Sequence, residues 1–256
     1  MSKKLLFVVS ILLIVSLITP ISFNQNSEGF NFLTLSETQA KKKKKKTKVR
    51  QTLFWDVYTD KYGKRRIKMS AVIKNTGKTN VRLSNGTGYF FDNNGNLFAN
   101  TSGNNIEPSI LAPGQEGYSS GVAYLSGGED FTRDANFNKS SIGRVEYEFT
   151  YKKTKEKPKS RLQVLNSSWR IDSNSDVDRY VVSGTLRNNT KKTIKFFNIL
   201  ALFYDSQGNL LYVGDADPAF YYITRKSNMS FDNGFSDFEM GVNQISSHRV
   251  IGYATY

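Results

Sequence analysis

Few residues of this 256-residue chain have the types and spacing that catalysis needs. The single histidine, His248, comes just before the last predicted strand without a nucleophile-elbow motif, so the sequence does not favour a Ser-His-Asp hydrolase. Cysteine is absent, which excludes thiol catalysis, disulfide bonds and a lipid-modified cysteine. A zinc site needs cysteine or several histidines, so no zinc is expected.

One pair of carboxylates has a spacing that acid–base chemistry could use. Glu146 and Glu148 lie two residues apart, so they share one face of a predicted strand. Paired carboxylates catalyse glycoside hydrolysis when a cleft separates them correctly. In this chain they alternate with Tyr147 and Phe149, which is typical of the solvent-facing side of a strand. We therefore expect no enzyme activity and no cofactor.

A second set of oxygen-bearing side chains, Asp92, Asn94 and Asn96, suggests a calcium loop at first sight. Its glycine falls at the fourth position, where an EF-hand needs it at the sixth, and the twelfth position is Gly103 instead of glutamate. We therefore predict a tight turn, in which Gly95 takes a positive φ and Asp92 caps the backbone. No metal ion is predicted.

The elements that must position these residues occur twice. Residues 74–98 align without a gap on residues 187–211, at an offset of 113 residues. Each copy has a β-branched and aromatic run that ends in Asp, then a Gly-containing turn, and then a second apolar run. This order predicts a hairpin. Each copy opens at a tryptophan (Trp55, Trp169) and closes on a strand that starts Arg-Val. This pattern predicts two tandem immunoglobulin-like antiparallel β-sandwich domains.

The end of the repeated strand carries a motif. Leu202-Phe203-Tyr204-Asp205 matches the end of the motif of the FxLYD-type domain of bacterial exported proteins, which this stretch resembles. Tyr89-Phe90-Phe91-Asp92 matches it less closely, and Gly88 and Ala201 stand where the motif has its leading Phe. The resemblance implies an immunoglobulin-like sandwich outside the membrane, with no known catalytic residues. It implies no particular ligand.

Alternation along the strands predicts which side chains face the core. The inward set of the repeated strand is expected to be Val81, Leu83, Tyr89 and Phe91 in the first copy, and Ile194, Phe196, Leu202 and Tyr204 in the second. Asn85 and Asn198 interrupt the alternation at the same place, where we expect a bulge or a capped backbone group.

The two copies differ on the side expected to face outward. The second copy has Phe197, Ile199 and Phe203 there, and Tyr221 and Tyr222 follow in the next loop. A strand that is apolar on both faces is either covered or a contact surface. These five residues are therefore the predicted surface for a protein partner, and the alternative is that a loop or the neighbouring domain covers them.

The net charge of +14 is concentrated in two short segments. Residues 41–50 supply +8, residues 152–161 supply +5, and the remainder of the chain carries +1. Such a distribution does not indicate a nucleic-acid-binding face on a folded domain. We predict that the first segment is disordered and binds an anionic envelope polymer or membrane surface, the alternative being a solvated spacer. Its basic residues are Lys41, Lys42, Lys43, Lys44, Lys45, Lys46, Lys48 and Arg50.

Residues 1–22 have the layout of a secretory signal, in which two lysines precede an apolar stretch. The signal is either cleaved, with the best site at Thr38-Gln39-Ala40, or retained as an anchor of 19 mostly apolar residues. The predicted organisation is residues 1–40 as signal or anchor plus spacer, 41–51 as a disordered lysine-rich tail, 52–152 as the first sandwich, 153–162 as a basic linker and 163–256 as the second sandwich.

These observations predict an exported, non-catalytic binding or assembly module that is secreted or held at the cell surface. Two alternatives remain open at this point. The first is an enzyme or an enzyme inhibitor that acts through the loops of the second domain. The second is a purely structural spacer.

Overall fold

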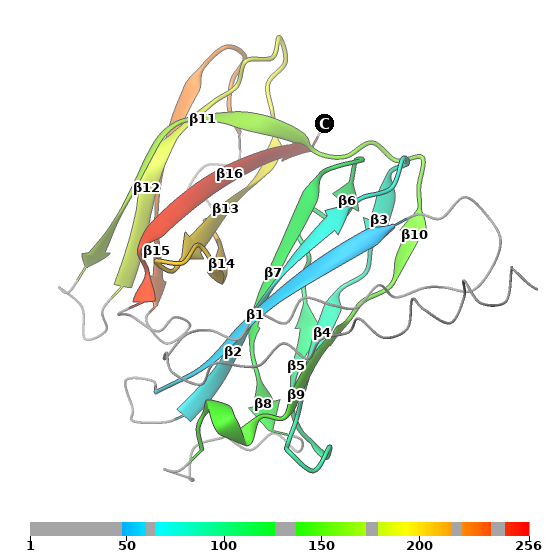
Figure 1. Cartoon of the computed structure of the whole chain (residues 1–256). Helices are drawn as coiled ribbons and strands as arrows, with labels where there is room; N and C mark the ends of the chain where they lie inside the picture. Colours follow the sequence, from blue (N-terminus) through cyan, green and yellow to red (C-terminus); the bar gives the residue numbers. More distant parts are fainter. Residues whose placement is uncertain are drawn as a thin grey trace, which may run out of the picture.

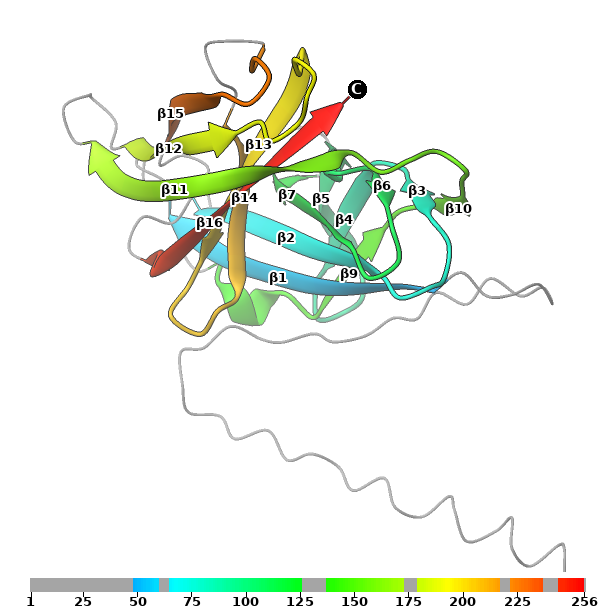
Figure 2. The same cartoon turned by 90° about the horizontal axis from the view of Figure 1, so that it is seen from above.

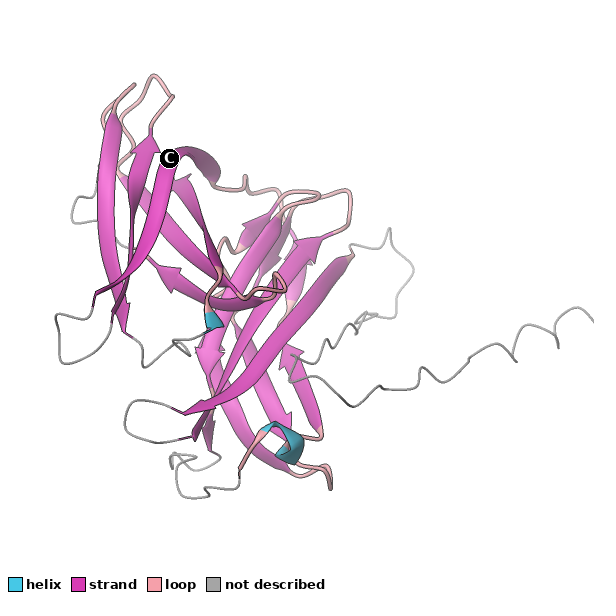
Figure 3. Ribbon diagram, turned by 60° about the vertical axis from the view of Figure 1, so that its left-hand side comes forward, coloured by secondary structure: helices cyan, strands magenta, loops and turns pink. Residues whose placement is uncertain are grey.

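The computed structural model describes residues 48–59, 65–125, 137–172, 179–216, 222–236 and 244–255. They form β-strands and short helical turns, of which η1 (Lys139–Ser141) is a 3₁₀ helix (Figure 3). Every strand pairing is antiparallel, so the predicted all-β class is confirmed. No helix in the described ranges is long and apolar enough to cross a membrane. The predicted signal or anchor segment lies outside these ranges.

The first unit, β1 to β10, has two facing layers (Figure 1). One layer has the strand order β1 (Val49–Thr59), β2 (Arg65–Asn75), β7 (Glu116–Val122). The other layer consists of two short sheets. The first has the strand order β10 (Tyr151–Lys153), β3 (Val81–Leu83), β6 (Ile110–Leu111). The second has the strand order β8 (Tyr124–Leu125), β5 (Leu97–Asn104), β4 (Gly86–Phe91), β9 (Arg144–Glu148). Apolar side chains from all three sheets, including Trp55, Ile73, Leu83 and Phe90, form one core between the layers.

The second unit is one six-stranded sheet that folds over on itself. Its strand order is β14 (Leu210–Asp215), β13 (Phe196–Tyr204), β16 (Ser247–Thr255), β11 (Ser160–Asp172), β12 (Arg179–Arg187), β15 (Asn228–Ser236). The first three residues of β11 pair with β16, and the strand pairs with β12 after a register shift between Val164 and Asn166. A bulge bends a strand, so β11 turns from one layer into the other. The core between the layers contains Tyr180, Leu186, Ile199 and Phe203.

The two units pack face to face. The outer face of the β1-β2-β7 layer meets the outer face of β14-β13-β16, and Figure 2 shows β14 crossing β2. Apolar contact is made by Tyr118 of the first unit with Leu200, Leu202, Ile251 and Tyr253 of the second. The arrangement is therefore four layers of sheet, with the inter-unit contact in the middle.

This contact explains why β2 departs from the alternation expected of it. In the sequence, Ile67, Met69, Ala71 and Ile73 alternate with polar residues, which predicts a strand with one buried face, and these four side chains face the core of the first unit. The opposite face was therefore expected to contact solvent, but Arg66, Lys68 and Ser70 are buried there. The second unit covers that face, which a strand's own sequence does not reveal.

The predicted inward set of the repeated strand is wrong beyond its first residues. Val81 and Leu83 are buried as expected, but Phe90 faces the core and Tyr89 lies on the other side. The chain leaves the sheet between β3 and β4, where the Ser84 amide donates to the carbonyl of Thr150. An interruption at Asn85 was expected, and it shifts the inward positions from odd to even numbers.

The same correction applies to the second unit. Ile194 is buried, but it forms an isolated bridge with Ile223 before β13 begins. Within β13, Ile199 and Phe203 face the core of the second unit, whereas Leu202 and Tyr204 face the first unit. Phe196, expected to face inward, is 69% exposed.

Two buried asparagines hold the same place in the two units. The Asn75 side-chain amide donates to the carbonyls of Thr79 (2.9 Å) and Leu111 (3.0 Å). The Asn188 amide donates to the carbonyls of Lys192 (2.8 Å) and Ile223 (3.1 Å). Each amide therefore ties the loop that follows its strand to a neighbouring segment, and buried polar groups need such partners.

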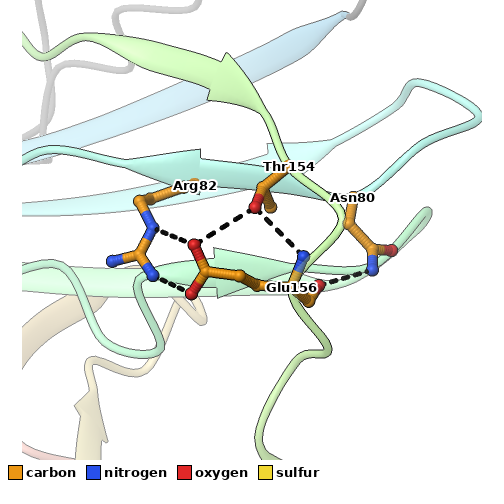
Figure 4. A network of polar contacts seen from close by, with 4 residues as sticks. All are labelled: Asn80, Arg82, Thr154 and Glu156. Atoms are coloured by element: carbon orange, nitrogen blue, oxygen red, sulfur yellow. Dashed lines mark hydrogen bonds and ion pairs between the residues drawn. The ribbon is translucent and has the colours of Figure 1, made fainter.

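Glu156 attaches the segment between the units to the first unit (Figure 4). Arg82 Nε donates to its carboxylate over 3.1 Å, and the second nitrogen of the guanidinium donates to the other oxygen. The Asn80 side chain donates to the Glu156 carbonyl over 2.9 Å, and the Glu156 amide donates to Thr154 Oγ1 over 3.1 Å. These bonds set the direction in which the chain leaves β10 for β11.

The strand bounds differ slightly from the predicted domain bounds. Val49 to Gln51, expected in the disordered tail, belong to β1. β11 begins at Ser160, inside the expected linker of residues 153–162.

Candidate functional site

A cleft of about 680 Å³ lies at one side of the first unit, between β1 of one layer and β9 of the other. Both strands are at the edge of their sheets, with a pairing partner on one side only among the described strands. Its lining residues are Gln51, Leu53, Ser84, Asn85, Thr87, Tyr89, Gly143, Arg144, Val145, Glu146, Tyr147, Glu148, Phe149 and Thr150. None of them belongs to the apolar cluster between the units, so the cleft is separate from the inter-unit contact.

The floor of the cleft is apolar. Leu53 and Tyr147 are buried in the core of the first unit, and Phe149 packs against it with its ring centroid 6.0 Å from that of Tyr147. Burial raises the pKa of the Tyr147 hydroxyl to about 12, while the nearby Ser119 hydroxyl acts in the opposite direction. The phenol is therefore neutral at physiological pH and contributes a ring and a hydroxyl dipole to the floor.

The rim of the cleft is polar and charged. β9 alternates, so Val145 and Tyr147 face the core while Arg144, Glu146 and Glu148 face away from it. Arg144 Nε lies 3.3 Å from Glu146 Oε1, and its guanidinium carbon lies 4.1 Å from the centroid of the Phe91 ring. The two glutamates and one arginine leave the β9 rim with a net negative charge. The glutamates are on the solvent side of the strand, as the alternation predicts.

Backbone groups also line this cleft. β9 pairs with β4 from Thr87↔Glu148 to Phe91↔Arg144, and no described strand pairs along its other side. An edge strand presents a row of amide and carbonyl groups that can pair with another chain. The cleft thus combines an apolar floor, polar rim side chains and an open backbone edge, which together suit a ligand that both buries apolar groups and forms hydrogen bonds.

The predicted partner surface of the second unit is not assembled as expected. Ile199 and Phe203 are 0% exposed and lie in the core, and Phe197 is half-buried against it. Because these side chains point into the unit, no partner can contact Ile199 or Phe203. Tyr222 is 59% exposed, whereas Tyr221 lies outside the described residues.

The predicted polyanion contacts are described only in part. Lys48 and Arg50 are exposed at the start of β1, close in sequence to Gln51 of the cleft. Lys41 to Lys46 lie outside the described residues. The basic segment therefore meets the folded part of the chain on the strand that forms one wall of the cleft.

His248 makes one contact that resembles part of a catalytic triad. Its Nε2 lies 3.0 Å from Ser167 Oγ, and burial lowers the pKa of the imidazole below its ordinary value. A triad also needs a carboxylate on the other ring nitrogen. Among the described residues, no carboxylate forms that hydrogen bond, so the pair is not assembled for nucleophilic catalysis.

The acidic turns are structural. Asp92 Oδ1 accepts hydrogen bonds of 2.8 Å from the amides of Asn94 and Asn96, and Gly95 has a φ of 85°. Asp205 holds the second turn in the same way. Both confirm the predicted turn chemistry. Within the described part of the chain, no three His, Cys, Asp or Glu side chains are grouped to hold a metal ion.

No protein-family model matches this chain, and no curated protein matches its sequence. Among solved structures, it is similar to the N-terminal CBM22-1-CBM22-2 tandem domain of Xyn10C from Paenibacillus barcinonensis, with 10% sequence identity over 90% of this chain and 92% of that one. The TM-score is 0.14, too low to support an inference about fold or function.

Sequence reasoning missed this cleft. It named Glu146 and Glu148 as a solvent-facing pair but did not place them beside Gln51 and Leu53, which are about 95 positions away in the chain. One signal was available. The first copy has Gly86 and Gly88 where the second has Ile199 and Ala201, and in the structure the Tyr147 ring and the Met69 side chain occupy the space that larger residues would need.

Proposed function

We propose that this protein is an exported, non-catalytic binding module of the cell surface. The observation that carries the proposal is the cleft beside β9, because it offers an apolar floor, a charged rim and an edge of β9 that no described strand pairs with. Binding sites of this size are usually concave and largely preformed, with a few polar groups that orient the ligand.

The charge distribution supports the location at a surface. Lysines and an arginine in residues 41–50 precede the first unit, and two of them, Lys48 and Arg50, are exposed on the folded chain. Each basic residue near an anionic surface contributes about 1 kcal/mol, and salt screens the attraction. The basic segment would hold the module at an anionic envelope while the cleft engages its ligand.

The test compares the full chain with a variant in which Lys41 to Lys46 are replaced by Ser. Binding of each to purified cell envelope is measured between low and high salt. We expect saturable binding of the wild-type chain that weakens with salt and is reduced at least tenfold in the variant. A matched control replaces Lys152, Lys153, Lys155 and Lys157 and should change binding much less. Equal binding of all three chains, or no saturable binding, would contradict the proposal.

Location is tested separately. Fractionation of the producing cells and N-terminal sequencing of the exported chain show whether the protein reaches the surface. They also show whether the segment before Lys41 is removed. Recovery of the protein only from the cytoplasm would contradict the proposal.

A further inference from the structure

The two units of this chain differ in how their sheets are joined at one side. In the second unit, β16 has partners on both sides, β13 and the first residues of β11. In the first unit, β4 corresponds to β13 through the repeat, and β9 pairs with β4 as β16 pairs with β13. β11 fills the place beside Gly252 to Ala254 of β16, which correspond to Phe149 to Tyr151, directly after β9, and the cleft extends along β9 as far as Phe149 and Thr150.

The difference comes from the first strand of each unit. β1 pairs with β2 in continuous register from Val49↔Asn75 to Thr59↔Arg65, so it stays in one layer. β11 shifts register between Val164 and Asn166, so its first residues reach the other layer (Figure 1). The chain therefore closes this side of the second unit with its own strand, whereas no described strand fills the matching place in the first unit.

We propose that the open edge of β9 binds an extended segment of a partner protein, which adds to the sheet as a further antiparallel strand. This rests on the proposed function and gives its ligand a chemical class. Strand addition to an exposed sheet edge is a general mode of peptide recognition, in which backbone hydrogen bonds give affinity and side-chain pockets give specificity.

The closing strand of the second unit shows what such a segment requires. Leu162 points into the core, 8% exposed, and Gly252 lies opposite it. Arg161 alternates with Leu162 and lies opposite Tyr253. In the first unit, the apolar floor of Leu53, Tyr147 and Phe149 would receive the inward side chains of a bound strand.

The rim adds a charge requirement. Glu146 and Glu148 lie on the side of β9 away from the core, and Arg144 is already paired with Glu146. The outward side chains of a bound strand come beside these carboxylates, because alternate residues of a strand share a face. The partner segment therefore has apolar residues at every second position and basic residues at the positions between them.

The experiment uses the full-length protein and a synthetic peptide that copies residues 159–165 of this chain, Lys-Ser-Arg-Leu-Gln-Val-Leu. Binding is measured by titration, and hydrogen–deuterium exchange locates it. We expect saturable binding, with new protection of amides in residues 144–151 and no change in the β14 and β15 edges. An N-methylated peptide that cannot donate along one edge should bind about fivefold more weakly for each hydrogen bond removed.

Charge is tested with an exposed residue that the fold does not need. Glu148→Lys should weaken binding of the basic peptide severalfold, while Asp232→Lys, at an exposed carboxylate of β15 in the second unit, should not. Circular dichroism and the unfolding midpoint show whether each variant is folded. A peptide with Asp in place of Leu162 should not bind, because its inward carboxylate would be buried in the apolar floor.

Several results would overturn the proposal. Protection at another edge, or equal binding of the N-methylated peptide, would rule out strand addition to β9. Protection of residues 144–151 that rises with protein concentration without peptide would assign the edge to a second copy of this chain. Binding of an oligosaccharide in the cleft, with no peptide binding, would assign the cleft to a saccharide. Envelope binding that persists in any of these cases would leave the proposed function standing and only its ligand class wrong.

Discussion

The hydroxyl of Ser70 donates a hydrogen bond of 2.8 Å to the backbone carbonyl of Leu211, a residue 141 positions further along the chain. Ser70 lies on the face of β2 that β14 covers, and it is 1% exposed. Ser120 donates to the carbonyl of Val213 over 2.9 Å on the neighbouring strand. Two hydroxyls of the first unit therefore provide the hydrogen bonds that β14 of the second unit needs where water is excluded.

Loss of the Ser70 hydroxyl should destabilise the contact between the units. Ser70→Ala leaves a buried carbonyl without this donor, which costs roughly 1–3 kcal/mol. Urea unfolding of the full chain measures the effect. The control is Ser183→Ala, because Ser183 aligns with Ser70 in the repeat but bonds to Ser168 on an exposed face. A surface change of this kind is within about 0.5 kcal/mol of zero. Equal costs for the two variants would show that the inter-unit bond contributes nothing.

Two phenylalanines on β13 test the corrected orientation of that strand. Phe203 is fully buried and its ring centroid lies 5.6 Å from that of Phe235, whereas Phe196 is 69% exposed. Phe203→Ala should lower the free energy of unfolding by roughly 3–5 kcal/mol, since it leaves a cavity in the core. Phe196→Ala should change it by less than about 0.5 kcal/mol. The unfolding midpoints of the two variants distinguish them, and the reverse order would restore the orientation predicted from sequence.

Lys68 should make stability depend on pH. Lys68 is 4% exposed between the units, and its ammonium donates to Gln244 over 3.0 Å. Burial lowers its pKa to about 8, while Asp56 and Asp205 oppose the shift. The unfolded chain keeps this proton up to about pH 10.5, so between pH 8 and 10.5 the unfolded state binds more protons and stability rises with pH. The full effect is on the order of 3 kcal/mol, present above pH 10.5 and lost as pH falls through 8.

The measurement is the unfolding free energy between pH 7 and 9, below the ordinary tyrosine pKa of about 10. Lys68→Met should remove the rise between pH 8 and 9 and should be more stable than wild type at pH 7, because a buried charge is replaced by an apolar side chain of similar size. Lys74→Met on the same strand is the control, since Lys74 is half exposed and paired with Glu116. A rise that persists unchanged in Lys68→Met would assign it to another group.

The two acidic turns should differ in how much they stabilise the fold. Asp205 is buried and accepts hydrogen bonds from the amides of Gln207 (2.9 Å) and Asn209 (2.7 Å), so Asp205→Ala leaves part-buried donors unpaired. That costs roughly 1–3 kcal/mol. Asp92→Ala should cost less, because water can replace the carboxylate in its exposed turn. Thermal unfolding of the two variants measures the difference, and a larger loss for Asp92→Ala would contradict it.

The pH response of the Asp92 turn has a defined sign. Hydrogen bonds from Asn96, and then from the amides of Asn94 and Gly95, hold the pKa of this carboxyl below its ordinary value of 3.8. Its contribution is therefore present above about pH 4 and is lost as pH falls through the lowered pKa. Asp92→Asn should show a smaller loss of stability on acidification than the wild-type chain.

Much of this fold could be predicted from local patterns. The turns at Asp92 and Asp205, the hairpins around them and the inward face of β2 follow from turn chemistry and from alternation over a few residues. These features depend on groups that are close in the chain. A repeat at a constant offset makes such predictions stronger, because two segments must satisfy the same constraint.

The candidate site could not be predicted in this way. Gln51 and Tyr147 both line the cleft because two edge strands come together from distant parts of the chain. No described strand pairs with the second side of β9, because β1 remains with β2 along its whole length. Which neighbour a strand pairs with depends on the competition between two possible partner strands. The alternation of apolar and polar residues along one strand does not encode that outcome.

The amino-acid sequence by itself determined the strands, the turns, the repeat and the position of the positive charge. Only the tertiary structure decided which faces are covered. The hydrophobic contribution of a face depends on the area removed from water, and on β2 and β13 the second face is covered by the other unit. It also decided that Ile199 and Phe203 point inward, because the strand break before β13 shifts the alternation by one residue. A one-residue shift exchanges the two faces of a strand, so a short break decides which side chains remain available to a partner.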